Sequence, residues 1–216
     1  MAMHMRDMDM FRIHLPNLHR MQGMTSSQDA QEIVLKAANW CYANYFTAGL
    51  QVCLESGFLA ADLTDEAGEN FLLASAAGLK RNNVLTMLLA YGANPDRVNT
   101  HGRSALLEAA IANNLEGINL LHQAQCNLNI KDPGQFTPLL SAIWEGATEA
   151  CLRLVELGAD VSPPATFSFS SLEEFAHASG HQECAQQLMA AIADRTAKGL
   201  NENTEAVMIV AERRSL

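Results

Sequence analysis

The stretch TPLLSAIWEGATEACLRLVELGADV, residues 137–161, decides the fold of this chain. It opens with Thr137, whose side chain can accept a hydrogen bond from a free N–H of the first turn, and Pro138 suits the first helical position. Residues 149–157, EACLRLVEL, predict a second helix with one apolar face, and Gly158 predicts its end in a left-handed conformation. Two helices this short cannot bury their apolar faces alone.

The same chemistry recurs every 33 residues on both sides of this stretch. Aliphatic and sulfur-containing residues align in columns: Leu73, Leu106, Leu139 and Leu172, and then Leu85, Ile118, Cys151 and Cys184. Small residues align as Ala76, Ala109 and Ala142, and turn residues as Gly92, Gln125 and Gly158. Repeats of this length bury their apolar faces against like neighbours. The rows predict an all-α solenoid of about five stacked helix-turn-helix units over residues 30–192, with Cys151 and Cys184 buried at equivalent places.

These residues carry a family resemblance. The segment 137–161 resembles the ankyrin repeat, as do SALLEAAIANNLEGINLL (104–121) and FLLASAAGLKRNNVLTMLLAYGAN (71–94). The resemblance implies an ankyrin-repeat solenoid with helical caps. We accordingly divide the chain into an N-terminal extension (1–24), an N-terminal capping repeat (25–65), ankyrin repeats (66–192) and a C-terminal tail (193–216).

The two ends of the chain lie outside the predicted repeats. The tail is compatible with a short capping helix at 205–214, preceded by a loop at 199–204, GLNENT. Residues 1–24 contain seven of the ten methionines and three histidines. Soft thioethers favour Cu(I), so this segment is one candidate for metal handling. The favoured interpretation is a disordered or mis-annotated extension, with translation starting at Met21 or Met24.

Composition and motifs argue against an enzyme. HExxH, GxSxG, P-loop and GxGxxG motifs are absent from the sequence, so we predict no catalytic residues, cofactor or metal site. The five cysteines are odd in number and form no CxxC, which favours a reducing, cytoplasmic compartment. No apolar run approaches the ~20 residues that a membrane span needs. His122 shares a column with Leu89, Val155 and Leu188, which predicts a histidine in the core.

Charge narrows the class of partner. Residues 25–192 contain 7 Lys/Arg and 18 Asp/Glu, a net charge of −11. An acidic surface repels nucleic-acid phosphates, so we expect no nucleic-acid partner. A protein with a basic surface is the expected partner.

The resemblance implies binding through loop tips and the exposed, concave side of the first helix of each repeat. Large side chains accumulate there although folding does not require them. The predicted partner-binding residues are Trp144, Phe136, Ile111, Arg103, His101, Phe167, Phe169, Glu145 and His177. Aromatic residues are frequent binding anchors. In the alternative interpretation Trp144 covers a groove between repeats, and Phe167 and Phe169 tuck beneath the loop 162–170.

The leading hypothesis is a monomeric, non-enzymatic scaffold or inhibitor that binds another protein. A bacterial immunity or antitoxin-type protein, or a secreted effector, is the alternative, based on analogy alone. A metal-handling protein that uses the Met/His segment is the third hypothesis.

Overall fold

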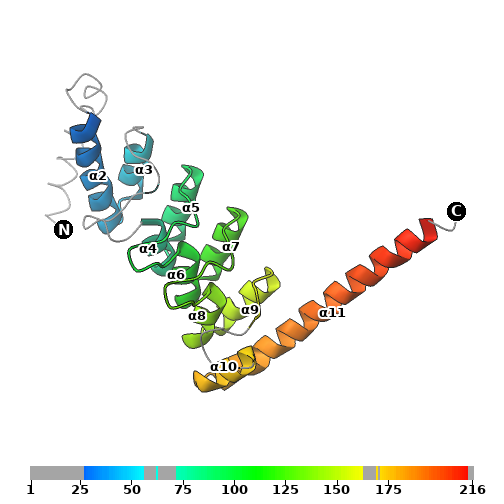
Figure 1. Cartoon of the computed structure of the whole chain (residues 1–216). Coiled ribbons are helices and arrows are strands. Elements are labelled where there is room, and N and C mark those ends of the chain that lie inside the picture. Colours follow the sequence, from blue (N-terminus) through cyan, green and yellow to red (C-terminus); the bar gives the residue numbers. More distant parts are fainter. Residues whose placement is uncertain (1–26, 56–61, 63–71, 163–168, 170, 214–216) are drawn as a thin grey trace. The chain divides into compact units, whose positions relative to one another are not determined.

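The computed structural model describes residues 27–55, 62, 72–162, 169 and 171–213 (Figure 1). Residues 1–24 and Phe167, both subjects of predictions, lie outside this part of the chain. Backbone contacts divide the protein into two compact units, one of residues 1–72 and 86–94 and the other of residues 73–85 and 95–216.

The described residues form helices and no strands, with one isolated antiparallel bridge between Val98 and Ser104. In chain order the helices make five consecutive pairs: α2 (Ser27–Ala43) and α3 (Thr47–Glu55), α4 (Leu72–Gly78) and α5 (Asn82–Ala90), α6 (Ala105–Ile111) and α7 (Leu115–Gln123), α8 (Pro138–Trp144) and α9 (Thr148–Glu156), α10 (Leu172–Ala178) and α11 (Gln182–Arg213). The all-α class and the repeated helix pair are thus confirmed.

In the first unit α2 packs against α3. Val34, Ala38 and Cys41 on α2 and Leu50 and Cys53 on α3 are fully buried. Apolar side chains from both helices therefore fill one small core.

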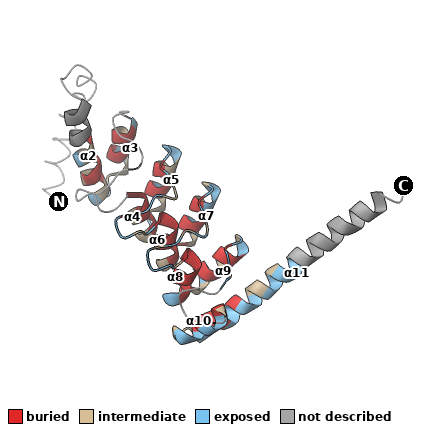
Figure 2. Cartoon of the chain, in the orientation of Figure 1, coloured by how far each residue is buried: buried red, intermediate tan, exposed pale blue. Residues whose placement is uncertain are grey.

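The core of the second unit follows the 33-residue columns. Helix α6 packs against α8, α7 against α9, and α9 against α11. Ile118, Cys151 and Cys184 are each at most 2% exposed, and the buried faces line up from helix to helix (Figure 2). The two sulfurs lie 3.7 Å apart, so these cysteines occupy equivalent places in adjacent repeats, as predicted.

Local sequence sets the helix ends. Thr137 Oγ1 accepts a hydrogen bond from Leu140 N at 3.3 Å, and Pro138 is the first residue of α8. At the other end of the pair Gly158 has φ +94° and donates its N–H to Val155 O at 3.1 Å. Only glycine adopts that backbone angle without strain, which confirms Gly158 as the stop of α9.

The inter-repeat loops are joined by side chains with the same period. Asp96 Oδ1 accepts the N–H of Asn127 at 2.7 Å, and Asn129 Oδ1 accepts the N–H of Asp160 at 2.8 Å. Each bond satisfies a main-chain donor in a segment without regular structure. The loops therefore have a defined geometry from one repeat to the next.

Two predictions about individual segments are wrong. Residues 199–204 are not a loop, because α11 continues without a break to Arg213. The segment has good helix formers on its N-terminal side, and its glycine is not enough to end the helix. His122 is exposed rather than buried, because it lies one residue past Leu121, which takes the core position.

Candidate protein-binding face

Two positions in each repeat frame the candidate site: the residue that precedes the N-cap of the first helix and the last residue of that helix. In the α6 repeat these are Arg103 and Ile111, and in the α8 repeat they are Phe136 and Trp144. All four line one groove of about 190 Å³, which we call the aromatic groove; its lining is completed by Leu107, Asp132, Ser141 and Glu145. Predicted binding residues from two repeats thus converge on one concave surface.

An aromatic cluster forms one wall of the groove. Phe136 meets Trp144 edge to face, with ring centroids 6.0 Å apart and an interplanar angle of 85°. Trp144 also stacks on Phe175 of α10 at 6.2 Å and 27°. Phe175 is 1% exposed whereas Trp144 is 54% exposed. A core ring therefore supports Trp144 from below, while more than half of Trp144 remains open to solvent.

The backbone at Trp144 is fixed by the last helix pair. His181 Nε2 lies 3.1 Å from Trp144 O, a hydrogen bond when Nε2 carries the proton. The His181 ring fills the space beside Gly146, where an added Cβ would lie 2.5 Å from Nδ1. Gly146 also has φ +69°, so both the backbone angle and the close approach require glycine.

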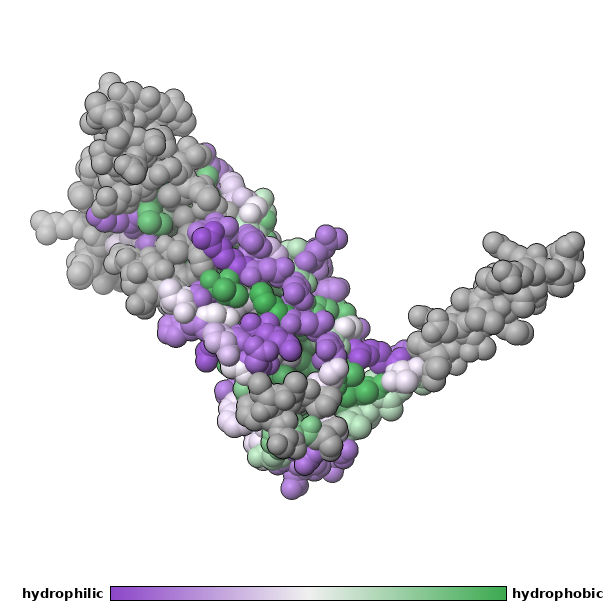
Figure 3. All heavy atoms as spheres, in the orientation of Figure 1, coloured by the Kyte–Doolittle hydropathy of each residue, from purple (hydrophilic) through white to green (hydrophobic). Residues whose placement is uncertain are grey.

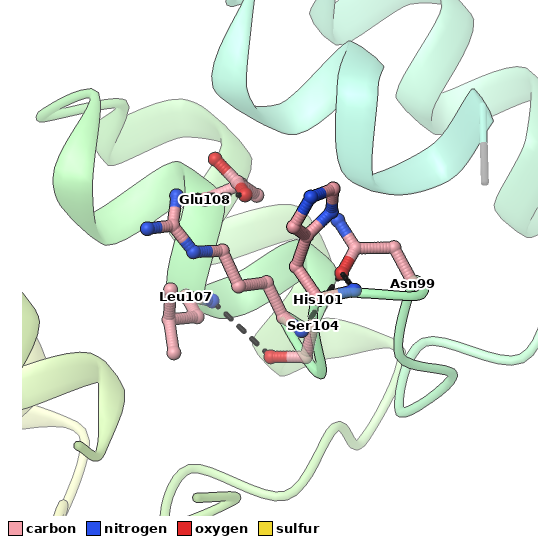
Figure 4. Close-up of polar contacts among 6 residues, drawn as sticks. Asn99, His101, Ser104, Leu107 and Glu108 are labelled. Carbon is pink, nitrogen blue, oxygen red and sulfur yellow. Dashed lines mark hydrogen bonds and ion pairs between the residues drawn. The ribbon is translucent and has the colours of Figure 1, made fainter. Parts of the chain in front are cut away.

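Asx-type hydrogen bonds position the residues before α6 and α8. Asn99 Oδ1 accepts the N–H groups of His101 and Arg103 at 3.0 and 2.9 Å (Figure 4). Asp132 Oδ1 accepts the N–H of Phe136 at 2.8 Å in the next repeat. Asn and Asp side chains bind nearby backbone in this way at tight turns. The loop therefore fixes the backbone from which the Phe136 side chain projects.

The groove lining carries more negative than positive charge. Arg103 Nη1 lies 3.5 Å from Glu108 Oε1, so this cation already has an anionic neighbour. Asp132 and Glu145 supply two carboxylates, and within the described residues neither belongs to an ion pair. On the face seen in Figure 3, hydrophobic residues form small patches among hydrophilic ones. The groove accordingly combines apolar surface with a net negative charge.

Three other predicted site residues, His101, His177 and Phe169, lie outside this groove lining. His101 is exposed at a loop tip, and His177 is exposed with Nε2 3.9 Å from Glu173 Oε1. Phe169 is half-buried and packs on Phe175 at 5.4 Å. This contact agrees with the alternative interpretation, in which Phe169 packs inward.

Sequence reasoning missed Phe175, the residue that organises the cluster. It follows Ala76, Ala109 and Ala142 in a column of small residues. A large side chain in that column was the available signal. Asp132 was missed as well, although Asp at the start of a turn is a recognised signal for a bond to its own loop.

Burial makes two of the cysteine thiols, Cys126 and Cys151, unreactive. All five cysteines lie in the described part of the chain, where they are free thiols and buried. Burial, together with the negative charge of Asp96, raises the pKa of Cys126 to about 12. The contact with the Cys184 sulfur and burial raise the pKa of Cys151 above its ordinary value. At neutral pH both are protonated and shielded, and so are poor nucleophiles.

The described residues show neither of two further features, a metal-binding cluster and a membrane-spanning helix. The described part of the chain holds no group of three or more His, Cys, Asp or Glu side chains arranged to hold a metal ion. It also holds no helix that combines the length and the apolar character of a membrane span.

Comparison with known proteins identifies the repeat. A family profile described as "Ankyrin repeats (3 copies)" matches residues 41–164. The E3 ubiquitin-protein ligase KEG of Arabidopsis thaliana is 35% identical over 95 residues, which are 41% of this chain and 6% of that protein. The ankyrin repeat protein nuc-2 of Neurospora crassa is 30% identical over 115 residues, 53% of this chain and 11% of that protein.

The matches to these two relatives thus cover a small fraction of their lengths. The match to the ligase lies in repeat sequence, so the activity in that name is a property of that protein. Ankyrin repeats mediate protein–protein interaction and typically act as non-enzymatic scaffolds. Because the family profile covers more than half of the sequence and the helix pairs follow the same period, the chain belongs to the ankyrin-repeat family.

Proposed function

We propose that this chain binds another protein through the aromatic groove and acts as a scaffold or an inhibitor for that partner. The observation that carries the proposal is the state of Trp144, which is 54% exposed yet stacked on buried Phe175. Trp is among the residues most enriched at binding hot spots. A ring already held in place loses little conformational entropy when a partner covers it.

A basic partner is supported by the charge of the chain. Residues 25–192 carry a net charge of −11, and the groove adds the carboxylates of Asp132 and Glu145. Opposite charge on the partner would raise the association rate and favour the correct orientation. The exposed residues His101 and His177 lie outside the groove lining, and we assign them to the rim of the interface, where contacts contribute less.

A reducing, cytoplasmic compartment fits the same proposal. The five cysteines are free although Cys151 and Cys184 have their sulfurs 3.7 Å apart. Proteins of oxidising compartments commonly pair such thiols.

Affinity capture with matched baits tests the function. The wild-type chain, Trp144→Ala and Tyr91→Ala are compared on lysate of the native host, and captured proteins are quantified and then titrated as pure partners. Tyr91 is a suitable control because it is an aromatic residue, 40% exposed, that lies outside the groove. We expect Trp144→Ala to weaken binding ~30-fold, since truncating a hot-spot residue costs ≥2 kcal/mol. A partner that binds Trp144→Ala and the wild type equally would contradict the proposed face.

The salt dependence of association tests the basic partner separately. Exposed charges are screened over ~8 Å at physiological ionic strength. The association rate with the purified partner should therefore fall markedly between low and high salt, while the dissociation rate changes less. An association rate that does not respond to salt would remove the electrostatic part of the proposal and leave the aromatic part.

A further inference from the structure

The aromatic groove combines three features that select one kind of guest. It has an exposed indole, a second aromatic ring set at 85° to it, and two carboxylates without an ion-pair partner within the described residues. A purely apolar guest would strip water from these carboxylates without replacing their hydrogen bonds, which is costly. A cation satisfies both the rings and the carboxylates.

The balance of charge in the lining supports a cationic guest. Arg103 contributes the positive charge of the lining, and Glu108 already lies 3.5 Å from it. Glu145 follows Trp144 directly at the end of α8 and is exposed. A carboxylate thus lies next in sequence to Trp144 within the lining of the same groove.

We propose that the aromatic groove binds one arginine side chain of the partner, stacked on Trp144 with its guanidinium hydrogen-bonded to Glu145 or Asp132. This inference rests on the proposed protein-binding function and specifies the chemistry of its central contact. Trp is the aromatic residue that attracts cations most strongly. A guanidinium is planar, so it stacks on a ring and still presents a fork of N–H donors to a carboxylate.

Arginine is favoured over lysine by the shape of the site. The Trp144 ring offers a flat surface, and stacking on Phe175 holds that surface in place. An ammonium is a compact, strongly hydrated charge that gains less from a flat ring than a weakly hydrated guanidinium does. The groove volume of about 190 Å³ accommodates a single side chain rather than a folded element.

Nuclear magnetic resonance of the ¹⁵N-labelled full chain tests the proposal. The probes are two blocked tripeptides, acetyl-Gly-Arg-Gly-amide and the same peptide with citrulline, which has the shape of arginine without its charge. The chain has two tryptophans, so the indole N–H signal of Trp40 is an internal control for that of Trp144. At low salt we expect the arginine peptide to shift the Trp144 signal with a Kd on the order of millimolar, and the citrulline peptide to bind at least about fivefold more weakly.

Two charge-matched variants locate the carboxylate. Glu145→Gln should weaken the binding of the arginine peptide about two- to fivefold. Glu183→Gln removes the same charge from an exposed residue of α11 outside the groove and should leave the affinity unchanged. Equal binding of the arginine and citrulline peptides, or shifts that spare Trp144, would overturn the arginine site.

The failures of the two proposals are distinguishable. If Trp144→Ala loses the protein partner while the arginine peptide does not affect the Trp144 signal, the binding face stands and the arginine site is wrong. If the peptide binds at Trp144 but the protein partner binds Trp144→Ala as tightly as the wild type, the groove is a cation site and the proposed function of the face is wrong.

Discussion

The last two helix pairs start alike and end differently. In the pair α8–α9 the second helix spans Thr148–Glu156. In the next pair the second helix, α11, continues from Gln182 to Arg213. The residue that stands 33 positions after Gly158 is Ala191. Gly158 takes φ +94° and ends α9, but Ala191 remains inside α11.

In this column the helix ends where the residue adopts a positive φ, as two glycines and Gln125 do, and continues where the residue is Ala191. Turn positions Gly92, Gln125 and Gly158 all have positive φ, and alanine is both the best helix former and a poor residue for that angle. The continued helix also gains a contact, because Arg195 Nη1 donates to Val155 O at 3.1 Å and to Ala159 O at 2.8 Å. Helix α11 thereby covers the end of α9.

The largest expected effect concerns what the two pairs share, the buried cysteine column. Cys151 is fully buried and Cys184 is 2% exposed. A thiol reagent should modify them about 10³-fold more slowly in native than in urea-unfolded protein, because access requires an opening that costs several kcal/mol. Labelling is followed by mass spectrometry with and without urea. Rapid native modification of either thiol would show that the columns are out of register.

The second prediction compares how much the two stacked rings, Phe175 and Trp144, contribute to the stability of the fold. Phe175→Ala should lower the free energy of unfolding by ~3–5 kcal/mol, because it empties a core position. Trp144→Ala should cost under ~1 kcal/mol and keep the melting temperature within a few degrees, since Trp144 is 54% exposed. Urea unfolding measures both. A large loss for Trp144→Ala would make this ring a core residue and displace the proposed face.

The third prediction concerns the contact that Arg195 of the last pair makes with the end of α9. Arg195→Ala should destabilise the protein by ~1–2 kcal/mol, because two carbonyl oxygens lose a charged donor. Lys198→Ala is the matched control, since Lys198 is exposed and pairs with Asp194 on the same helix. Equal stability of the two variants in thermal unfolding would mean that α11 does not cover α9 through Arg195.

The smallest effect tests the turn column itself. Gly158→Ala should cost ~1 kcal/mol, since nothing crowds the site and the positive φ is the sole obstacle. Ala191→Gly should cost ~0.5–1 kcal/mol and reduce the helix signal in circular dichroism. If Gly158→Ala instead raised the helix content strongly, α9 would be running on past its present end.

Much of the fold was accessible from sequence because its signals are local and repeated. Thr137, Pro138 and Gly158 act within their own repeat, so each could be read directly. The failure at 199–204 has a physical reason: polar residues and one glycine resemble a loop, but a helix anchored by Arg195 upstream continues through them. The exposure of His122 shows that a column fixes the phase of a helix to within one residue only.

The candidate site was predictable only in part. Phe136, Trp144, Ile111, Arg103 and Glu145 could be placed on one face from the period, and they do line one groove. Their energetic roles depend on a residue of the next repeat, because Phe175 decides which side of Trp144 is covered. The column of Phe175 signals an unusually large side chain, but it does not say that this side chain stacks on Trp144 of the preceding repeat. Phe167 lies outside the described residues, so its predicted role stays a prediction.

The hydrogen bond between His181 and Trp144 links ligand binding at Trp144 to the stability of the last helix pair. His181 and Phe175 both belong to the last helix pair, and together they position the backbone and the ring of Trp144. Terminal repeats of such arrays have neighbours on one side only and open more readily than central ones. A ligand seated on Trp144 would therefore bind the closed last pair better than the frayed one, and would stabilise it by RT ln(1 + [L]/Kd). Slower amide hydrogen exchange in α10, a helix that contributes no residue to the groove lining, is the expected signature of occupancy.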